Sequence, residues 1–360
     1  MSPVAGARLT VINPGPTAPY SGMLPGHVAG HYTRDDLDIN LVRLCRMAGA
    51  RFISGKADGL DLMNKTVSVP GRPPVPYDLA SLDIGITSEM PKLPGFIKHA
   101  HPAKPLGPFA RDWEVFVADD GPKTVAVIGA GVAGCELAMA MAYRLQGQPA
   151  EITLIEAGDE ILRDTLPRTR ARLRHHLDRL GITLRTGAGA SEVTADGVHL
   201  SNGGFVDARY VTGAAATRPQ TWLERTHLEL HDGFIKVRPD LRSSDPSVYA
   251  VGDCAHLTDN PRPKAGVYAV RQAPFLFANL RADLTGRARR PYRPQPGYLK
   301  LISVGDKIAV ADKFGITIEG KHWWALKDRI DAKFMGQFKK LKPMSLPAPS
   351  GDVSRGVADL

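Results

Sequence analysis

The 360-residue sequence has few cysteines and no close pair of them. Cys45, Cys135 and Cys254 are the three cysteines, and they lie far apart along the chain. An odd number of scattered cysteines argues against a disulfide framework, and no Cys-x-x-Cys pair supports a structural zinc site. We therefore predict no metal site, three buried cysteine side chains that act as small hydrophobic groups, and a reducing, cytoplasmic location.

A signal peptide and a long uninterrupted apolar run are also missing. The first eight residues, MSPVAGAR, lack the apolar core of a signal peptide. The most hydrophobic stretch, residues 124–142, contains three glycines and Glu136, so a strand, a turn and a helix explain it better than a membrane span. Lys and Arg outnumber Asp and Glu by 46 to 37. No basic patch interleaved with aromatic residues accompanies that charge, so we predict no nucleic-acid partner.

Apolar periodicity predicts an α/β protein. Helices are predicted over residues 35–48, 131–145, 166–180 and 266–284. Strands are predicted at 8–12, 51–54, 65–69, 77–84, 124–128, 151–156, 183–185 and 210–213, and within 192–206. Residues 91–108 contain five prolines and are predicted to be a connection between two units.

Residues 129–134 read Gly-Ala-Gly-Val-Ala-Gly, the fingerprint of a dinucleotide-binding loop. A strand leads into Gly129, a helix follows Gly131, and a second strand ends at Glu156, 22 residues after Gly134. Gly129 permits the tight turn, Gly131 lets the backbone approach a pyrophosphate, and Gly134 lets the helix and sheet pack closely. The loop predicts an NAD(H) site that includes Ala130 and, at the end of the last strand of the unit, Gly213.

Glu156 stands where a carboxylate accepts hydrogen bonds from the 2′-hydroxyl of the adenosine ribose. No Lys or Arg follows it before Arg163, which favours NAD(H) over NADP(H). Glu136, on the first turns of the following helix, has two interpretations: it complements the helix dipole, or it lies near the nicotinamide as a catalytic group.

Five further segments carry a family resemblance: residues 17–26, 77–85, 248–254, 263–272 and 301–306. They resemble the two-dinucleotide-domain flavoproteins, also called pyridine nucleotide-disulfide oxidoreductases. The resemblance extends to about Gly336. The segments resemble the type II NADH dehydrogenases. They resemble even more closely the flavoprotein module associated with selenide, water dikinase.

The resemblance implies two Rossmann-like, three-layer domains plus a small C-terminal α+β region. An NAD(H)-binding domain at 108–230 would be inserted into an FAD-binding domain, which comprises residues 1–107 and 231–296. The residues themselves predict a hairpin and a helix at 297–342, and a disordered, Pro/Ser/Gly-rich tail at 343–360. The implied cofactors are FAD and NAD(H).

The resemblance also implies a flavin site. Asp253, after Gly252, would hydrogen-bond the ribityl chain, and a helix beginning at Lys264, Ala265 and Gly266 would point its N-terminus at the flavin. The other interpretation of Gly252 and Asp253 is a turn after a strand. Three more residues match flavin-contacting segments of the family: Asn13, Tyr20 and Gly85.

One family feature is missing, the first strand with its own G-x-G-x-x-G for the FAD pyrophosphate. Residues 8–12 match the family's second strand, and Asn13 takes the place of the ribose-binding residue. We considered three explanations: an N-terminal segment of about 25 residues is lost upstream, FAD binds poorly, or another element fills the gap. We favour the first.

The implied activity is an FAD-dependent NADH oxidoreductase that passes hydride from NADH to flavin N5 and then electrons to a small acceptor. Quinone is the acceptor expected from the resemblance, whereas the missing cysteine pair disfavours disulfide reduction. The alternative is an NAD(H)-binding protein with impaired or absent flavin that acts through a partner, in a sensing or non-catalytic role.

The C-terminal helix has a basic, amphipathic pattern. Its apolar residues fall within an arc of about 120° at 100° per residue. They are Trp323, Leu326, Ile330, Phe334, Phe338 and Leu341. Trp323–Leu341 therefore suits peripheral contact with the inner face of the membrane. Packing on the FAD domain, or across a homodimer, is the alternative that we favour for this helix.

Overall fold

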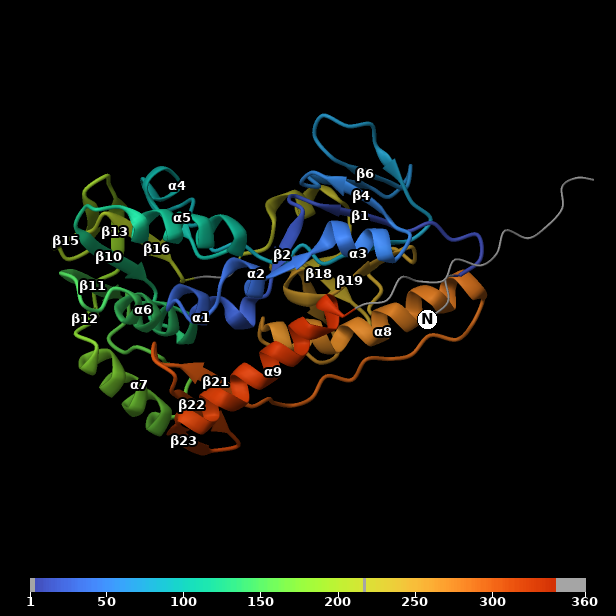
Figure 1. Cartoon of the computed structure of the whole chain (residues 1–360). Coiled ribbons are helices and arrows are strands. Elements are labelled where there is room, and N and C mark those ends of the chain that lie inside the picture. The colour runs from blue at the N-terminus through green and yellow to red at the C-terminus, as the bar shows by residue number, and fades with distance from the viewer. Residues whose placement is uncertain (1–3, 216–217, 341–360) are drawn as a thin grey trace, which may run out of the picture.

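The computed structural model describes residues 4–215 and 218–340 (Figure 1). The predicted tail at 343–360 lies outside the described residues. One group of elements lies on the left of Figure 1 around β10, and a second group lies on the right around β1 and β19. The last three strands and the last helix run along the bottom of the molecule in that view.

The left-hand group is built on a five-stranded parallel sheet in the order β12-β11-β10-β16-β9. Its strands are β9 (His101–Pro102), β10 (Lys123–Ile128), β11 (Ala150–Ile155), β12 (Thr183–Arg185) and β16 (Tyr210–Gly213). The central strand β10 is buried on both faces, which is typical of a parallel sheet covered on both sides.

Two different layers cover this sheet. Val125 and Val127 of β10 pack into a core with the helices α5 (Leu106–Ala118), α6 (Val132–Arg144) and α7 (Pro167–Arg179). Ala126 and Ile128 point the other way, toward an antiparallel sheet. That sheet consists of β13 (Ala190–Val193), β14 (Gly197–Leu200) and β15 (Phe205–Asp207). The result is the three-layer, Rossmann-like unit predicted from the sequence.

The right-hand group contains two parallel pairs that each form a separate two-stranded sheet. β1 (Thr10–Asn13) pairs with β4 (Arg51–Ser54), and β8 (Ala80–Leu82) pairs with β19 (Val248–Ala250). In the part of the chain that the structure describes, neither β1 nor β8 has a second partner strand.

Smaller sheets complete the right-hand group. They are formed by β2 (Thr17–Pro19) with β3 (Asp38–Asn40), by β5 (Gly59–Asp61), β6 (Thr66–Ser68) and β7 (Val75–Pro76), and by β17 (Leu230–His231), β18 (Phe234–Val237) and β20 (Ala255–Leu257). A second core cluster, which includes Tyr249 and Leu241, holds this group together.

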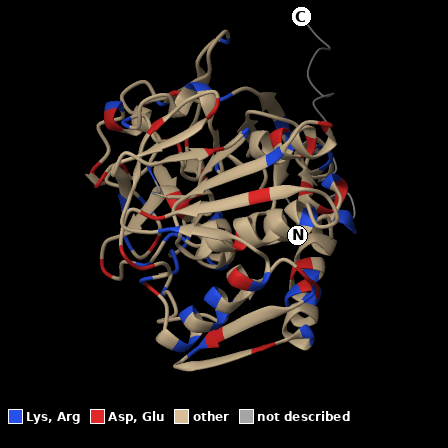
Figure 2. Ribbon diagram, turned by 90° about the vertical axis from the view of Figure 1, so that its left-hand side faces the viewer, with Lys and Arg blue, Asp and Glu red and all other residues tan. Residues whose placement is uncertain are grey.

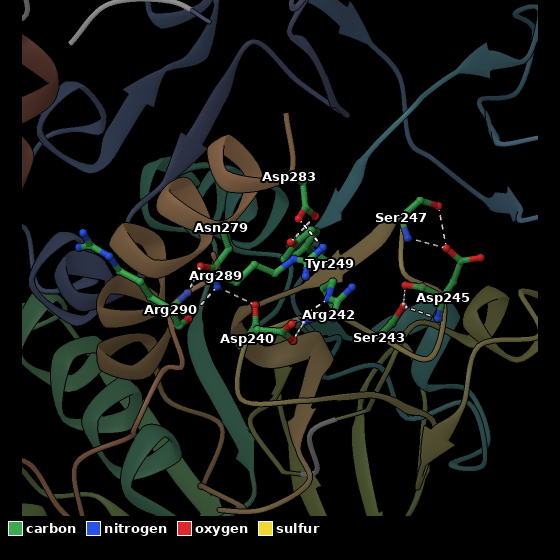
Figure 3. A network of polar contacts seen from close by, with 10 residues as sticks. All are labelled: Asp240, Arg242, Ser243, Asp245, Ser247, Tyr249, Asn279, Asp283, Arg289 and Arg290. Carbon is green, nitrogen blue, oxygen red and sulfur yellow. Dashed lines mark hydrogen bonds and ion pairs between the residues drawn. The ribbon is translucent and has the colours of Figure 1, made fainter. Parts of the chain in front are cut away.

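A polar network fixes the C-terminal end of α8 (Gly266–Thr285) against β19 (Figure 3). The Tyr249 hydroxyl donates to Asp283 at 2.6 Å, and Arg289 pairs with the same carboxylate. Asn279 is fully buried and binds both the backbone N–H and the carbonyl of Arg290. These contacts join α8 to β19.

The C-terminal region is an antiparallel sheet with a helix on each side. The sheet contains β21 (Lys300–Ser303), β22 (Ala309–Lys313) and β23 (Ile316–Gly320), and α9 (Lys321–Lys339) follows directly. Thr169 of α7 binds Asp312 and Thr317, while Met335 of α9 joins the core that contains Ile302. The predicted hairpin and helix are therefore confirmed, with one further strand.

Two sequence predictions of local structure are wrong. The predicted helix over residues 35–48 is two short helices, α2 (Arg34–Leu37) and α3 (Leu41–Met47), separated by β3. Pairing of β3 with β2 interrupts the helix, and the Asn40 side chain then caps α3 by accepting from the Arg43 N–H. The predicted connection at 91–108 contains the short helix α4 (Phe96–His99) and the sheet strand β9.

Candidate functional site

The fingerprint loop lies between β10 and α6 and has the backbone geometry that nucleotide binding requires. Gly129 has φ of +103°, and a Cβ there would lie 2.6 Å from the Ala215 nitrogen. A Cβ at Gly134 would lie 1.8 Å from the Gly129 carbonyl oxygen. Gly131 is different, because a Cβ there would meet nothing within 4 Å. Two glycines therefore serve the fold, and Gly131 faces open space.

The N-terminus of α6 is available for an anion. Its N-cap is Gly131, and no side chain caps the helix. The first N–H groups of a helix carry partial positive charge and bind phosphate oxygens when no cap satisfies them. The loop can therefore hold a pyrophosphate, as the sequence predicts.

Glu156 lies beside this loop at the end of β11. Its carboxylate accepts from the Ala130 N–H at 2.9 Å and from the Gly158 N–H at 3.0 Å. Both bonds hold the side chain at the fingerprint, where the sequence places the ribose. Gly213 ends β16, and a Cβ there would lie 2.6 Å from the Phe96 ring, so close packing explains this glycine. A nucleotide contact of Gly213 stays a prediction.

Glu136 sits on the first turns of α6 and is enclosed by the C-terminal region. Its Oε1 accepts from the Ser303 N–H at 2.7 Å. Burial raises the pKa of Glu136 to about 7, and the positive charge of Lys327 acts in the opposite direction. Lys327 itself donates to Asp331 at 2.7 Å. A proton on Glu136 is therefore held near neutral pH, and its proximity to a nicotinamide stays a prediction.

The turn at Gly252 and Asp253 carries a compact charged group. Gly252 has φ of +69°, and a Cβ there would lie 2.4 Å from Asp83 Oδ1. Lys104 Nζ donates to Asp253 at 2.8 Å. The surrounding protein raises the pKa of Asp83 to about 6, and Asp253 adds to this, although the Asp83 side chain stays open to solvent. This turn therefore places two carboxylates and one lysine around a bend that only glycine adopts easily.

A small pocket opens between this turn and the N-terminus of α8. The α8 N-terminus has no side-chain cap and no acidic residue in its first turn. Ala265 is the N-cap, and a Cβ at Gly266 would lie 3.3 Å from Ser21 Oγ. Lys264 donates to the Ala255 carbonyl and lies over the Phe234 ring, and burial lowers its pKa. The lining residues are Gly252, Asp253, Ala255, Leu257, Arg262, Pro263, Lys264, Ala265, Tyr268 and Gln272.

The other residues predicted to contact flavin lie apart from this cavity lining. Asn13 ends β1 and donates its Nδ2 to the Gly15 carbonyl at 2.7 Å. The Tyr20 hydroxyl donates to Asp331, and its ring packs on Phe334. Gly85 follows β8 with φ of +64°. Their roles toward a flavin stay predictions.

Tyr298 packs against the first turn of α8. Its ring contacts Tyr268 of α8 edge-on, with centroids 5.7 Å apart. Burial raises the pKa of Tyr298, and the negative charges of Tyr268 and Glu136 contribute.

Comparison with known proteins agrees with this arrangement. The sequence profile of the pyridine nucleotide-disulphide oxidoreductases matches residues 2–273. The chain belongs to this family. The family is one of oxidoreductases, and its cofactors are FAD and NAD(H). The predicted resemblance to its type II NADH dehydrogenase-like branch is confirmed, whereas the closer tie to the selenide, water dikinase module stays a prediction.

Three relatives illustrate the range of the family. The chain is 35% identical over 143 residues to a nitric oxide reductase FlRd-NAD(+) reductase of Klebsiella pneumoniae, a match that covers 38% of this chain and 36% of that protein. It is 25% identical over 297 residues to the demethylphylloquinone reductase NdbB of Synechocystis, covering 78% and 72%. The structure of NDH2 from Plasmodium falciparum in complex with NADH has a TM-score of 0.77 at 13% identity, covering 92% and 93%.

The described residues fit part of an FAD molecule. The glycine turn, the carboxylates and the uncapped α8 N-terminus suit the ribityl chain and the flavin ring. No second fingerprint occurs in the sequence for the diphosphate. The fit therefore rests on the flavin end of the site, and the contacts of these residues with FAD stay predictions.

Several site residues gave no usable sequence signal. Lys104 lies in the proline-rich connection, Asp83 in a strand, and Lys327 among the charged residues that flank an amphipathic stripe. Only the folded chain brings each of them to a candidate site. Elsewhere, basic and acidic residues are interspersed along the chain (Figure 2). The net charge of +9 is therefore not concentrated in a single basic region.

The cysteines and helices agree with the other sequence predictions. All three cysteines are buried and free, and burial raises the pKa of Cys254 to about 12. Among the helices of residues 4–215 and 218–340, none is sufficiently long and apolar to cross a membrane.

Proposed function

We propose that this chain is an FAD-dependent NADH oxidoreductase that delivers electrons to a small second acceptor. The observation that carries the proposal is the presence, in one chain, of an open fingerprint at α6 and a glycine-aspartate turn facing the uncapped N-terminus of α8. The first matches a pyridine nucleotide, and the second matches a flavin.

The flavin, when bound, supplies the hydride-accepting chemistry. The chain's own residues bind, orient and hold protons. The α6 N-terminus and Glu156 hold the two ends of the nucleotide's adenosine diphosphate half. Asp253 accepts hydrogen bonds from hydroxyl groups, and Lys104 donates to the same carboxylate. The positive end of α8 stabilises negative charge next to the cavity.

Glu136 is suited to hold a proton between the two sites. It is half-buried, burial raises its pKa to about 7, and Ser303 fixes its orientation. A group with this pKa exchanges protons readily at physiological pH. We propose it as the proton-holding group of the reaction.

We favour a quinone as the second acceptor. The relative from Synechocystis bears the name demethylphylloquinone reductase. Disulfide substrates are disfavoured, because Cys45, Cys135 and Cys254 are buried and unpaired. Peripheral membrane contact is part of the same proposal: Leu326 and Ile330 of α9 are 37% and 48% exposed, and Phe314 of the adjacent hairpin is 76% exposed. The predicted domain limits, including the inserted unit at 108–230, and a homodimer also stay proposals.

The experiment is reconstitution of the full chain with FAD, followed by visible absorption and NADH oxidation with a water-soluble quinone. We expect a yellow protein whose flavin band bleaches on addition of NADH and returns with quinone. A protein that stays colourless after reconstitution, and does not oxidise NADH, contradicts the proposal.

The alternative is an NAD(H)-binding protein that acts through a partner and lacks competent flavin. The unpartnered edges of β1 and β8 among the described residues favour it, because a flavin diphosphate would lie near that gap in the sheet. NADH binding without flavin retention is the result expected from this alternative.

A further inference from the structure

Asp83 lies directly beside the Gly252 turn, because two paired strands end at the same place. Strand β8 ends at Leu82, which is opposite Ala250 of β19. Asp83 follows β8, and Gly252 follows β19 after one intervening residue. A Cβ at Gly252 would lie 2.4 Å from Asp83 Oδ1. The carboxyl ends of two parallel strands thus bring Asp83 to the turn that carries Asp253.

The Asp83 carboxyl group has no hydrogen bond or ion pair with protein atoms of residues 4–215 and 218–340. Two donors at this turn are engaged elsewhere. The Gly252 N–H donates to the buried Gln272 side chain at 2.7 Å, and Lys104 donates to Asp253 at 2.8 Å. Asp83 is therefore left without a protein partner at the candidate flavin site.

The surroundings of Asp83 favour its protonated form. Burial raises its pKa to about 6, and the negative charge of Asp253 adds to the effect. The side chain is nevertheless exposed, and both observations hold for a carboxyl group in an open hollow. The other titratable groups around the turn are Lys104, Lys264 and the buried thiol of Cys254. Among the described residues, one lysine pairs with Asp253 and the other donates to a backbone carbonyl, so neither pairs with Asp83.

A ligand that covers the Gly252 turn changes the proton affinity of Asp83. Exclusion of water from an unpaired carboxylate disfavours its charged form. The neutral carboxyl group can donate one hydrogen bond and accept others, and it lies beside Asp253 without like-charge repulsion. Ligand binding and protonation of Asp83 therefore favour each other through linkage.

We propose that Asp83 binds FAD in its protonated form, so that flavin binding takes up a proton and weakens as the pH rises. The proposal rests on the flavin site of the proposed function and deepens it by adding control through pH. Because the pKa of Asp83 is about 6 before a ligand binds, the carboxyl group is mostly protonated below this pH and mostly ionised above it. Flavin affinity should therefore be constant below about pH 6 and should fall above it.

The test is calorimetric titration of the flavin-free full chain with FAD at pH 5.5, 7 and 8, for the wild type, Asp83→Asn and Asp78→Asn. Asp78 is an exposed aspartate two residues before β8 and serves as the matched control. We expect the wild-type Kd to rise about ten- to a hundredfold from pH 5.5 to pH 8. Asparagine resembles the neutral acid, so Asp83→Asn should bind at every pH about as tightly as wild type does at pH 5.5. Asp78→Asn should follow the wild type.

Titration at pH 7 in two buffers of different ionisation enthalpy measures the proton directly. We expect the wild type to take up about half a proton or more per FAD, and Asp83→Asn to take up much less. Burial also raises the pKa of Glu136 to about 7, so Glu136→Gln is titrated in parallel and should retain the wild-type proton uptake.

Two results overturn the inference while leaving the proposed function intact. One is FAD binding by the wild type with the same Kd at all three pH values. The other is the same weakening with pH in Asp83→Asn as in wild type, which would assign the proton to another group. Failure of the wild type to bind FAD at any of these pH values overturns the proposed function as well.

Discussion

The carboxylate of Glu136 accepts a hydrogen bond from the Ser303 backbone at 2.7 Å, which joins α6 to the C-terminal sheet. Burial is the main reason that the pKa of Glu136 rises from 4.5 to about 7. The folded protein therefore holds this proton more tightly than the unfolded chain. The resulting stability is present below pH 4.5 and is lost as the pH rises through about 7.

Glu136→Gln should remove this pH dependence. Glutamine keeps an oxygen that accepts from the Ser303 N–H, and it carries no charge. We therefore expect the free energy of unfolding of the variant to exceed that of wild type by about 1–3 kcal/mol at pH 8 and to differ little at pH 4.5. Urea unfolding at the two pH values measures the difference. Glu151→Gln, at an exposed position of β11, is the control and should show no such change. If the free energy of unfolding changed equally with pH in wild type and Glu136→Gln, the prediction would be contradicted.

Gly252→Ala should disrupt the candidate flavin turn. The substitution adds a Cβ 2.4 Å from Asp83 Oδ1 at a residue with φ of +69°. We expect a loss of about 1–3 kcal/mol of stability together with loss of flavin retention. Gly286→Ala is a matched control, because Gly286 has φ of +65° and its Cβ would meet nothing within 4 Å. If both variants lose the same free energy of unfolding and both retain flavin, the close contact with Asp83 contributes neither to stability nor to flavin binding.

Gly131→Ala and Gly134→Ala should separate ligand binding from folding. A Cβ at Gly131 points into open space, so we expect the free energy of unfolding to change by no more than about 1 kcal/mol, while NADH binding weakens about tenfold or more. A Cβ at Gly134 would lie 1.8 Å from the Gly129 carbonyl oxygen, so this variant should be strongly destabilised. Thermal unfolding and NADH titration distinguish the two. Normal NADH affinity in Gly131→Ala would argue against the predicted approach of the pyrophosphate.

Local patterns predicted the nucleotide loop well because its constraints are local. Gly129, Gly131 and Gly134 are fixed by one turn, and Glu156 follows from the end of the next strand. The helix predicted over 35–48 failed because β3 pairs with a strand 20 residues earlier, and this tertiary pairing overrides helical periodicity.

The two faces of α9 should respond differently to substitution. Phe334 is packed between Tyr20 and Phe338, with ring centroids 4.6 Å and 5.2 Å away. Removing that ring by Phe334→Ala should cost about 3 kcal/mol of stability, as for other large-to-small changes in packed sites. Ile330 is 48% exposed, so Ile330→Ser should change stability by no more than about 0.5 kcal/mol.

Vesicle binding tests whether the exposed face of α9 contacts a lipid surface. If Leu326 and Ile330 enter a lipid surface, the double variant Leu326→Ser/Ile330→Ser should sediment less with phosphatidylglycerol vesicles than wild type, at unchanged stability. Met63, an exposed apolar residue in the distant turn between β5 and β6, provides the control Met63→Ser, which should sediment like wild type. Equal sedimentation of all three proteins would show that this face is not a lipid contact. A wild type that forms a dimer while the double variant is monomeric would instead assign the face to a homodimer, because the same apolar side chains would then be buried between two copies.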